Sequence, residues 1–452
     1  MSSRLRILNV THVLPDRDQA AAYSPPPLPD DGLVRLSFMD ALFVDRAMPM
    51  RRLFFYEGPD VPPLPRLVRS LRSSLATALA VFPPLSGKLT NRPSAAGGDV
   101  VVDCSPPAAT PGVRFVEAEY DGDMRRVAGG SEEGDGEALL ELGPELDATH
   151  LPAPVLAVQV TRQAGGGGRA VVVGVAVHHA VADGHSVWQF MRAWAALSRL
   201  AEGSRGVADL APPAFDRTPI RYPEAEELAR KILRTIAPAL PVIVNERTIE
   251  QLRSPSSCPP PDRRRRTFLI HADEIQSVKQ LIRAQSQTIG KQSETQPSTY
   301  LAVSSLVWTS IARAKSRDLA GGDAYFLVAV DYRRRLGPPI DEHYFGDCVV
   351  PCVARAAVRD LRDDGSAGLA HAAAAIRDAI RAQPEDPVRG MEAWLESQRT
   401  VPRERLTFAG SSNRFMAYET DFGWGAPSRV ELVSLFATEL VLLLGAPDGG
   451  VQ

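Results

Sequence analysis

Cysteine is scarce in this sequence, which has four such residues among its 452. Four thiols are too few for the disulfide framework of a small secreted domain. The spacing of two of them, Cys348 and Cys352, fits neither a zinc ribbon nor a CxxC redox pair. We therefore expect both to be buried as small hydrophobic residues.

An excess of charge of one sign is also lacking, since 51 lysines and arginines stand against 54 aspartates and glutamates. The net charge of -3 gives no overall field to attract nucleic acid or an anionic membrane, so we expect neither as a partner. No stretch approaches the roughly 18 apolar residues of a membrane-spanning helix, and residues 1–16 lack the apolar centre of a signal peptide. We expect a cytosolic protein.

The sequence does contain the pattern of a mixed α/β protein. Leucines at positions 64, 67, 71, 75 and 79 repeat at helical spacing and predict a helix over 64–80. The β-rich runs 155–161 and 169–177, joined by four glycines, predict a hairpin whose second strand is central. Further strands are predicted at 100–104, 113–119, 267–270 and 324–330, and further helices at 272–283, 300–314, 369–381 and from Ser186 onward.

Strands and helices alternate in both halves of the chain, which indicates two domains of similar size. The predicted N-terminal domain spans 1–200, and the predicted C-terminal domain spans 241–452. The stretch 201–240, which includes a Gly-, Ala- and Pro-rich segment, is predicted to be the crossover linker between them. Part of 385–425 is expected to pack back on the N-terminal domain.

The densest group of reactive side chains lies where the predicted strand 169–177 ends and a helix is about to begin. It reads His178-His179-Ala180-Val181-Ala182-Asp183-Gly184-His185. A histidine at such a strand end, followed four residues later by an aspartate, suits a general base whose surroundings are fixed by a carboxylate. A pair of histidines with satisfied hydrogen bonds in the core is the alternative interpretation.

Two other kinds of site are less well supported at this segment. His178, His179, Asp183 and His185 are all metal-ligand types, but adjacent residues leaving a strand point to opposite faces, so we expect no metal. A serine hydrolase is disfavoured because no GxSxG motif precedes these residues.

A second conspicuous segment is Asp421-Phe422-Gly423-Trp424-Gly425. Two glycines around a tryptophan imply a tight backbone path under a large ring. Asp421 is the one member that could exchange protons. Taken by itself, the pentapeptide is typical of a structural turn.

The segment 179–184 (HAVADG) and the DFGWG pentapeptide together resemble the plant BAHD acyl-CoA-dependent acyltransferases. The resemblance covers nearly the whole chain, because further motifs occur in that family's order. They are LSFMDALFV at 36–44, FFY at 54–56, FPPLSGKL at 82–89 and the DxRxR of Asp331, Arg333 and Arg335. The segment YFGDC at 344–348 is similar to the YFGNC signature of the flavonoid and phenolic-glucoside malonyltransferase branch, with Asp347 in place of the asparagine.

The resemblance implies two chloramphenicol-acetyltransferase-like domains with an active-site channel between them. His179 would be the general base, which takes the proton of an acceptor hydroxyl as that oxygen attacks the thioester carbonyl, without an acyl-enzyme. Asp183 would orient the site by pairing with an arginine of the 331–335 loop. His178 is expected to be structural.

The other motif residues are expected to be structural, namely Gly184, Asp331, Arg333, Arg335 and the five residues of DFGWG. Four residues near the donor entrance are candidates for contacts with CoA. They are Arg265, Thr267, Ser298 and Thr299. A solvated, charged edge is the alternative for the basic run 263–266.

We therefore expect an enzyme that transfers an acyl group, preferentially malonyl from malonyl-CoA, to a hydroxyl of a phenolic or flavonoid glucoside. It would act as a monomer without a bound cofactor. A hydroxycinnamoyl-CoA-type O- or N-acyltransferase is one alternative, and a condensation domain of peptide synthesis, which lacks DFGWG, is another. Family members usually continue beyond the GGV at 449–451, whereas this sequence ends at Gln452. A non-catalytic, truncated relative that binds a ligand is therefore the third alternative.

Overall fold

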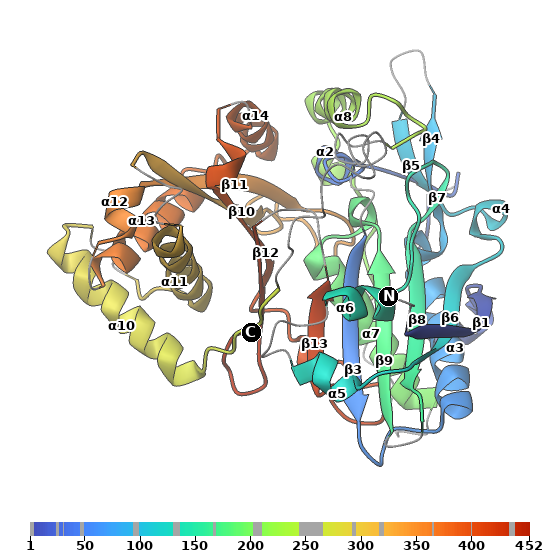
Figure 1. Ribbon diagram of the computed structural model, residues 1–452. Helices are drawn as coiled ribbons and strands as arrows, with labels where there is room; N and C mark the ends of the chain where they lie inside the picture. The colour runs from blue at the N-terminus through green and yellow to red at the C-terminus, as the bar shows by residue number, and fades with distance from the viewer. Residues whose placement is uncertain are drawn as a thin grey trace, which may run out of the picture. The chain divides into compact units, whose positions relative to one another are not determined.

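Two compact units divide the chain (Figure 1). Unit 1 contains Met1–Thr267, Asp341–Asp347 and Ala417–Ser434, and unit 2 contains Phe268–Ile340, Cys348–Met416 and Leu435–Gln452. The computed structural model describes residues 4–23, 27–29, 31–45, 49–93, 99–129, 136–165, 169–201, 210–243, 265–291, 295–315, 321–363, 366–398, 400–433 and 439–452. Within these ranges, none of the helices combines the length and the apolar character needed to cross a membrane.

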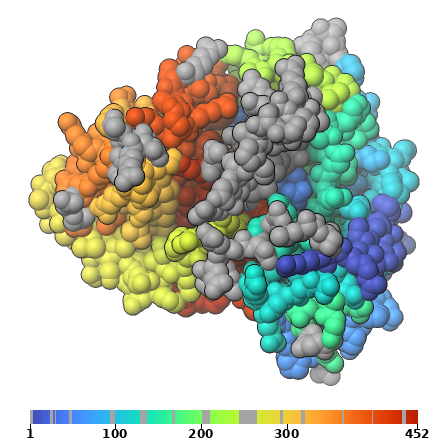
Figure 2. Space-filling view, viewed as in Figure 1, coloured from blue at the N-terminus to red at the C-terminus, as the bar shows by residue number. Residues whose placement is uncertain are grey.

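The main sheet of unit 1 has the strand order β1-β6-β8-β9-β3-β13 among the described residues. Its strands are β1 (Leu5–Val13), β6 (Val113–Tyr120), β8 (Leu156–Gln163), β9 (Ala170–Val177), β3 (Met50–Glu57) and β13 (Arg429–Val433). Neighbouring strands are antiparallel, except that β6 and β8 are parallel. Strand β1 forms one edge and lies at the surface, in dark blue in Figure 2, with Ile7 and Val10 exposed.

Strand β9 lies inside this sheet, and all eight of its residues are buried. Its run of valines suits a strand that is covered on both faces. Gly174 interrupts the run because a Cβ atom there would come within 2.7 Å of the carbonyl oxygen of Leu142. The prediction of a central strand over 169–177, antiparallel to its predecessor, is thus confirmed.

Helices cover both faces of the main sheet. On one face, α7 (Gly184–Ala201) contacts α3 (Leu64–Val81), and the Trp194 indole donates to the Leu71 carbonyl and the Ser74 hydroxyl. On the other face lie α5 (Met124–Gly129) and α6 (Gly136–Leu142), whose apolar side chains join those of β3 and β9 in one cluster. This arrangement buries the aliphatic side chains of both faces and forms the core of unit 1.

Smaller elements complete unit 1. A second sheet has the order β2-β5-β4-β7, with β2 (Leu33–Arg35), β5 (Asp99–Asp103), β4 (Lys88–Arg92) and β7 (Ala153–Pro154). The remaining α-helices among the described residues of this unit are α1 (Arg17–Ala20), α2 (Phe38–Ala41), α4 (Pro106–Ala109) and α8 (Pro223–Ile236).

In its described residues, unit 2 is a four-stranded sheet with helices packed on it. The strand order is β11-β10-β12-β14, formed by β11 (Val349–Ala357), β10 (Asp323–Asp331), β12 (Leu406–Ser412) and β14 (Leu440–Leu444). Its helices are α10 (Ala272–Thr288), α11 (Thr299–Ala314), α12 (Val358–Leu361), α13 (Ala367–Arg381) and α14 (Pro387–Ser397). Side chains of α10, α11 and α13 meet in one apolar cluster, and all three helices lie where the sequence predicted helices.

The structure differs from the predicted domain boundaries. The predicted linker 201–240 holds helix α8, which contacts α2, and unit 1 continues to Thr267. Unit 1 also takes in Ala417–Ser434, because β13 completes its main sheet beside β3. Of the segment 385–425 that was expected to pack back, residues 417–425 belong to unit 1 and the rest to unit 2.

The predicted strand 267–270 is wrong. Ile270 forms a single bridge with Val451, while Phe268 and Leu269 are exposed. A β-rich composition does not make a strand where one face finds no apolar surface to cover. Of the basic run 263–266, residues 263 and 264 fall outside the described residues.

Both cysteines expected in the core are buried, Cys348 completely and Cys352 nearly so. Burial raises the pKa of the Cys352 thiol to about 12, so this side chain stays protonated and acts as a small apolar group.

Candidate active site

His179 lies two residues beyond the end of the buried strand β9, in the one-turn 3₁₀ helix His179–Val181. Its side chain is 16% exposed, whereas Ala180, Val181 and Asp183 around it are buried. A partly accessible imidazole in a buried frame can meet a substrate and keep a fixed orientation.

Two contacts within unit 1 hold the His179 ring. The ring stacks on Phe43, with 3.7 Å between the ring centroids and an interplanar angle of 10°. Its Nδ1 atom lies 3.1 Å from the Oδ1 atom of Asp347. A carboxylate at Nδ1 favours the tautomer with the proton on that nitrogen, which leaves the lone pair of Nε2 to accept a proton.

Asp347 is itself fully buried and held by its backbone. Its N–H donates to Oδ1 of Asp40 over 2.8 Å, and Oδ2 of Asp40 accepts from Nε of Arg217 over 3.0 Å. Asp40 also forms a capping box with Ser37 at the start of α2, and Phe43 follows Asp40 three residues later. The same short segment therefore places the ring that stacks on His179 and the carboxylate that anchors Asp347.

Arg217 supplies the positive charge of this buried group. Burial alone would lower the pKa of its guanidinium, but Asp40, Tyr344 and Asp347 raise it, and the net shift is upward. Gly346 makes room for the arginine, since a Cβ atom at this position would lie 2.7 Å from Nη2 of Arg217. Its φ of +154° adds a second reason for glycine in the YFGDC segment.

Asp183 caps helix α7. Its Oδ1 atom accepts from the backbone N–H of Ser186 over 2.9 Å, and its carbonyl accepts from the N–H of Val187. The Ser186 hydroxyl in turn donates to the Gly346 carbonyl and accepts from the Gly346 N–H. Asp183 thus fixes the start of α7, and Ser186 in this first turn holds Gly346, the neighbour of Asp347. Gly184 is the first residue of α7.

His178 has a different environment from its neighbour. It is completely buried, and its Nδ1 atom accepts from the N–H of Ala180 over 3.2 Å. Burial lowers the pKa of this imidazole to about 4, so the ring is neutral near pH 7. These contacts favour a structural role for His178.

The DFGWG segment packs against α7 and β3 in unit 1. Asp421 Oδ1 accepts from the N–H groups of Gly423 and Gly425, both of which have positive φ values. The Phe422 ring lies against Trp194 and Tyr56, and the Trp424 ring also lies against Tyr56. These contacts form a turn and pack aromatic rings, as a structural role requires.

The DxRxR residues belong to unit 2. Asp331 Oδ1 accepts from the backbone N–H of Arg333 and lies 3.3 Å from its Nη1 atom. Arg335 donates to the Ile380 carbonyl and lies over the Tyr332 ring. The predicted pairing of Asp183 with an arginine of this loop stays a prediction, because Asp183 is part of unit 1.

The four candidate CoA contacts have varied surroundings. Arg265 forms an ion pair with Glu431 and donates to the Leu432 carbonyl, and Thr267 is half-buried. In unit 2, the Ser298 hydroxyl caps α11, of which Thr299 is the first residue. Their role in binding CoA stays a prediction.

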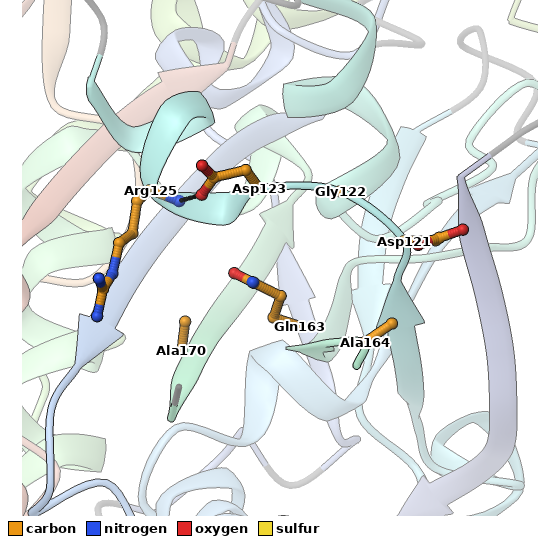
Figure 3. A pocket seen from close by; sticks show the side chains of 7 residues that line it. All are labelled: Asp121, Gly122, Asp123, Arg125, Gln163, Ala164 and Ala170. Atoms are coloured by element: carbon orange, nitrogen blue, oxygen red, sulfur yellow. Dashed lines mark hydrogen bonds between the residues drawn. The ribbon is translucent and has the colours of Figure 1, made fainter. Parts of the chain in front are cut away.

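A surface pocket of about 420 Å³ lies at the opposite end of β9 from His179. Figure 3 shows Asp123 beside the backbone nitrogen of Arg125, and Gln163 accepts from the Met124 N–H. Both side chains thus cap the start of α5. None of the predicted site residues lines this pocket.

Sequence reasoning placed His179 and Asp183 in one segment but did not foresee the contacts of Phe43, Asp40, Arg217 and Ser186. Two signals were present in the sequence. The motif 36–44 contains both Asp40 and Phe43, and the replacement of asparagine by Asp347 marked a change of charge. Neither signal states which residues meet in space.

Comparison with known proteins decides the family. The model of the Transferase family matches residues 24–452. The chain belongs to this family, the BAHD acyltransferases. It is 28% identical over 462 residues to phenolic glucoside malonyltransferase 1 of Arabidopsis thaliana, covering 99% of this chain and 93% of the relative.

A second relative of this BAHD acyltransferase is the malonyl-coenzyme:anthocyanin 5-O-glucoside-6'''-O-malonyltransferase of Salvia splendens. The two are 26% identical over 433 residues, which cover 91% of this chain and 84% of the relative. The crystal structure of vinorine synthase matches with a TM-score of 0.70 at 19% identity, covering 99% of this chain and 93% of that one. The chloramphenicol-acetyltransferase-like fold is thereby confirmed, and the protein is an acyl-CoA-dependent acyltransferase.

Proposed function

We propose that this acyltransferase moves a malonyl group from malonyl-CoA to a sugar hydroxyl of a phenolic or flavonoid glucoside. The observation that carries the proposal is the position of His179, whose Nδ1 atom faces Asp347 while its ring is fixed on Phe43. The donor and acceptor classes are supported by the two malonyltransferases to which the chain is similar.

In the proposed reaction, Nε2 of His179 takes the proton of the acceptor hydroxyl while the hydroxyl oxygen attacks the thioester carbonyl. The carbon–sulfur bond then breaks, and the imidazolium returns the proton to the departing CoA sulfur. The products are a malonyl ester and free CoA thiol. No acyl-enzyme is formed, and the imidazole is neutral again at the end of the cycle.

A donor competition tests this function. Malonyl-CoA, acetyl-CoA and p-coumaroyl-CoA are mixed at equal concentration with one phenolic glucoside, and the esters formed are quantified by mass spectrometry. We expect malonyl ester to predominate. Predominance of the coumaroyl ester would refute the malonyl assignment and favour the hydroxycinnamoyl-CoA-type alternative, while the acyltransferase activity would stand.

A second measurement separates catalysis from mere binding. Release of free CoA thiol should require the glucoside and should fall about 10² to 10⁴-fold in the His179→Ala variant. Binding of malonyl-CoA without thiol release in the wild-type protein would support the non-catalytic alternative instead.

A further inference from the structure

Arg52 is a buried cation without a carboxylate partner in the part of unit 1 that the structure describes. It lies in β3 and is 5% exposed. Its Nη1 atom donates to the Arg51 carbonyl over 3.1 Å, and its Nη2 atom lies 3.7 Å from the sulfur of Met50. Its Nε atom is buried and has no acceptor among the described residues.

Burying this guanidinium without a counter-ion destabilises the folded protein unless an anion binds beside it. A buried guanidinium loses its hydration, and a thioether is a weak acceptor in exchange. Burial lowers the pKa of Arg52 to about 10, so the group still carries its charge near pH 7. Arg217, equally buried in the same unit, shows the usual solution, because its Nε atom donates to Asp40.

Arg52 and His179 belong to the same face of the main sheet. Arg52 is paired with Val175 of β9, and Met50 is paired with Val177. Residues directly opposite in a sheet share a face, and alternate residues along a strand share it too. His178 still has an extended backbone, so His179 continues the series of Val175 and Val177 on the face of Arg52.

The Arg52 side chain also points along the strand toward His179. From Val175, which is opposite Arg52, to His179 is four residues, or roughly 13 Å along an extended strand. The guanidinium turns back toward Met50, which is opposite the last residue of β9 before the two histidines. The long side chain therefore shortens the separation between the charge and the imidazole.

We propose that Arg52 binds the free carboxylate of a carboxyl-bearing acyl donor, such as the malonyl group of malonyl-CoA. The inference rests on the proposed function and names the residue that would select the donor. The guanidinium has N–H groups free to grip a carboxylate, and a charge-assisted bond in a buried setting is strong. His185 is less suited, since it is half-exposed and its Nε2 atom lies 3.2 Å from the Glu342 carbonyl.

The kinetic test compares Arg52→Gln, Arg52→Lys and the wild-type enzyme with malonyl-CoA and acetyl-CoA. We expect Arg52→Gln to lower the ratio of kcat/KM for malonyl-CoA to that for acetyl-CoA about 100-fold, and Arg52→Lys to lower it much less. Arg51→Gln is the matched control, because Arg51 directly precedes Arg52 in β3 and donates to the Pro144 carbonyl on the opposite face. An unchanged ratio in Arg52→Gln, or an equal change in Arg51→Gln, would overturn the proposal.

A binding test works without turnover. Malonyl-CoA and acetyl-CoA are titrated calorimetrically into the His179→Ala variant with and without Arg52→Gln, after circular dichroism has shown that both proteins are folded. Malonyl-CoA should bind about 100-fold more weakly to the double variant, with little change for acetyl-CoA. Equal affinity of malonyl-CoA for both would overturn the role of Arg52, even if transfer to glucosides succeeds. If transfer fails, a selective loss of malonyl-CoA binding would still support the site. If Arg52→Gln does not fold, Arg52→Lys is compared with the wild-type residue in the same two measurements. Lysine keeps the charge but cannot donate two parallel hydrogen bonds to a carboxylate, so the preference for malonyl-CoA over acetyl-CoA should fall. An unchanged preference in both kinetics and affinity would overturn the proposal.

Discussion

The Nδ1 atom of His179 and the Oδ1 atom of Asp347 lie 3.1 Å apart within unit 1. The family branch that the sequence resembles has asparagine at the position of Asp347. An asparagine oxygen and a carboxylate oxygen can both accept a hydrogen bond from the Nδ1–H group, so the orientation of the imidazole needs an acceptor but not a full charge. We regard Asp347 as a positioning residue that acts through His179.

Asp347→Asn should therefore retain kcat within about tenfold, whereas Asp347→Ala should lower kcat about 100-fold with little change in KM. Both variants keep the backbone N–H that donates to Asp40. Steady-state kinetics with malonyl-CoA and one phenolic glucoside measure the split between kcat and KM. Glu342→Gln, in the same segment but with a 76% exposed side chain, is the control. Equal losses in the asparagine and alanine variants would contradict this role.

His179→Ala should lower kcat by about 10² to 10⁴-fold with little change in melting temperature, because it removes the proposed base and leaves the frame around it. His178→Ala should lose less activity, since this ring is buried and accepts from the Ala180 N–H. Turnover and thermal unfolding are measured on both variants. The reverse order of activities would identify His178 as the base.

Asp183→Ala should destabilise the protein by about 1 to 2 kcal/mol through loss of the α7 cap, and it should lower activity because Ser186 then holds Gly346 less firmly. Asparagine preserves a cap, so Asp183→Asn separates capping from charge. A loss of about 3 to 5 kcal/mol in Asp183→Asn would point to the arginine counter-charge expected from the family. Urea unfolding gives the free energies. Normal stability with a shifted pH–rate profile would show instead that Asp183 titrates in catalysis.

Stability should fall on acidification because of His178. Its pKa is about 4 in the folded protein, against an ordinary value of 6.5. Below pH 6.5 the His178 side chain is protonated in the unfolded chain but stays neutral in the folded protein. The free energy of unfolding therefore falls as the pH is lowered, until the pH reaches about 4. Each pH unit in this window costs about 1.4 kcal/mol, and above the window the contribution is constant.

The His178→Asn variant tests this pH dependence, because asparagine can accept from the Ala180 N–H without titrating. Its free energy of unfolding, measured by urea between pH 4 and pH 7.5, should fall less steeply than that of the wild-type protein. His150→Asn, at an exposed position, is the matched control and should keep the wild-type slope. Identical slopes for all three proteins would show that His178 does not titrate as proposed.

Local patterns in the sequence predicted much of the fold. Helix α3 was predicted because its leucines repeat at helical spacing, and helices α10, α11 and α13 lie where helices were predicted at 272–283, 300–314 and 369–381. Strand β13 was not predicted, because five residues near the end of the chain carry too little periodicity. Its place beside β3 depends on a surface that forms elsewhere in the chain.

The site was predicted in part for the same reason. His179 and Asp183 share one short segment whose chemistry can be read directly. The bond between Asp347 and Asp40 joins residues 307 positions apart, and no local pattern encodes such a distance. Nothing in the sequence singles out Arg52, since its burial and the absence of a carboxylate partner among the described residues become visible only in three dimensions.

The main sheet of unit 1 includes one strand, β13, that comes much later in the sequence than its neighbour β3. A ribosome that has finished β3 at Glu57 must add some 370 residues before Arg429 begins β13, which takes roughly 20 to 75 s at ordinary speeds of translation. During that interval, the edge of β3 that will pair with β13 has no partner strand of its own chain. Nascent chains therefore expose an unpaired strand edge during this interval, and such an edge can pair with other chains and aggregate. We expect chaperones that shield strand edges to increase the yield of this protein.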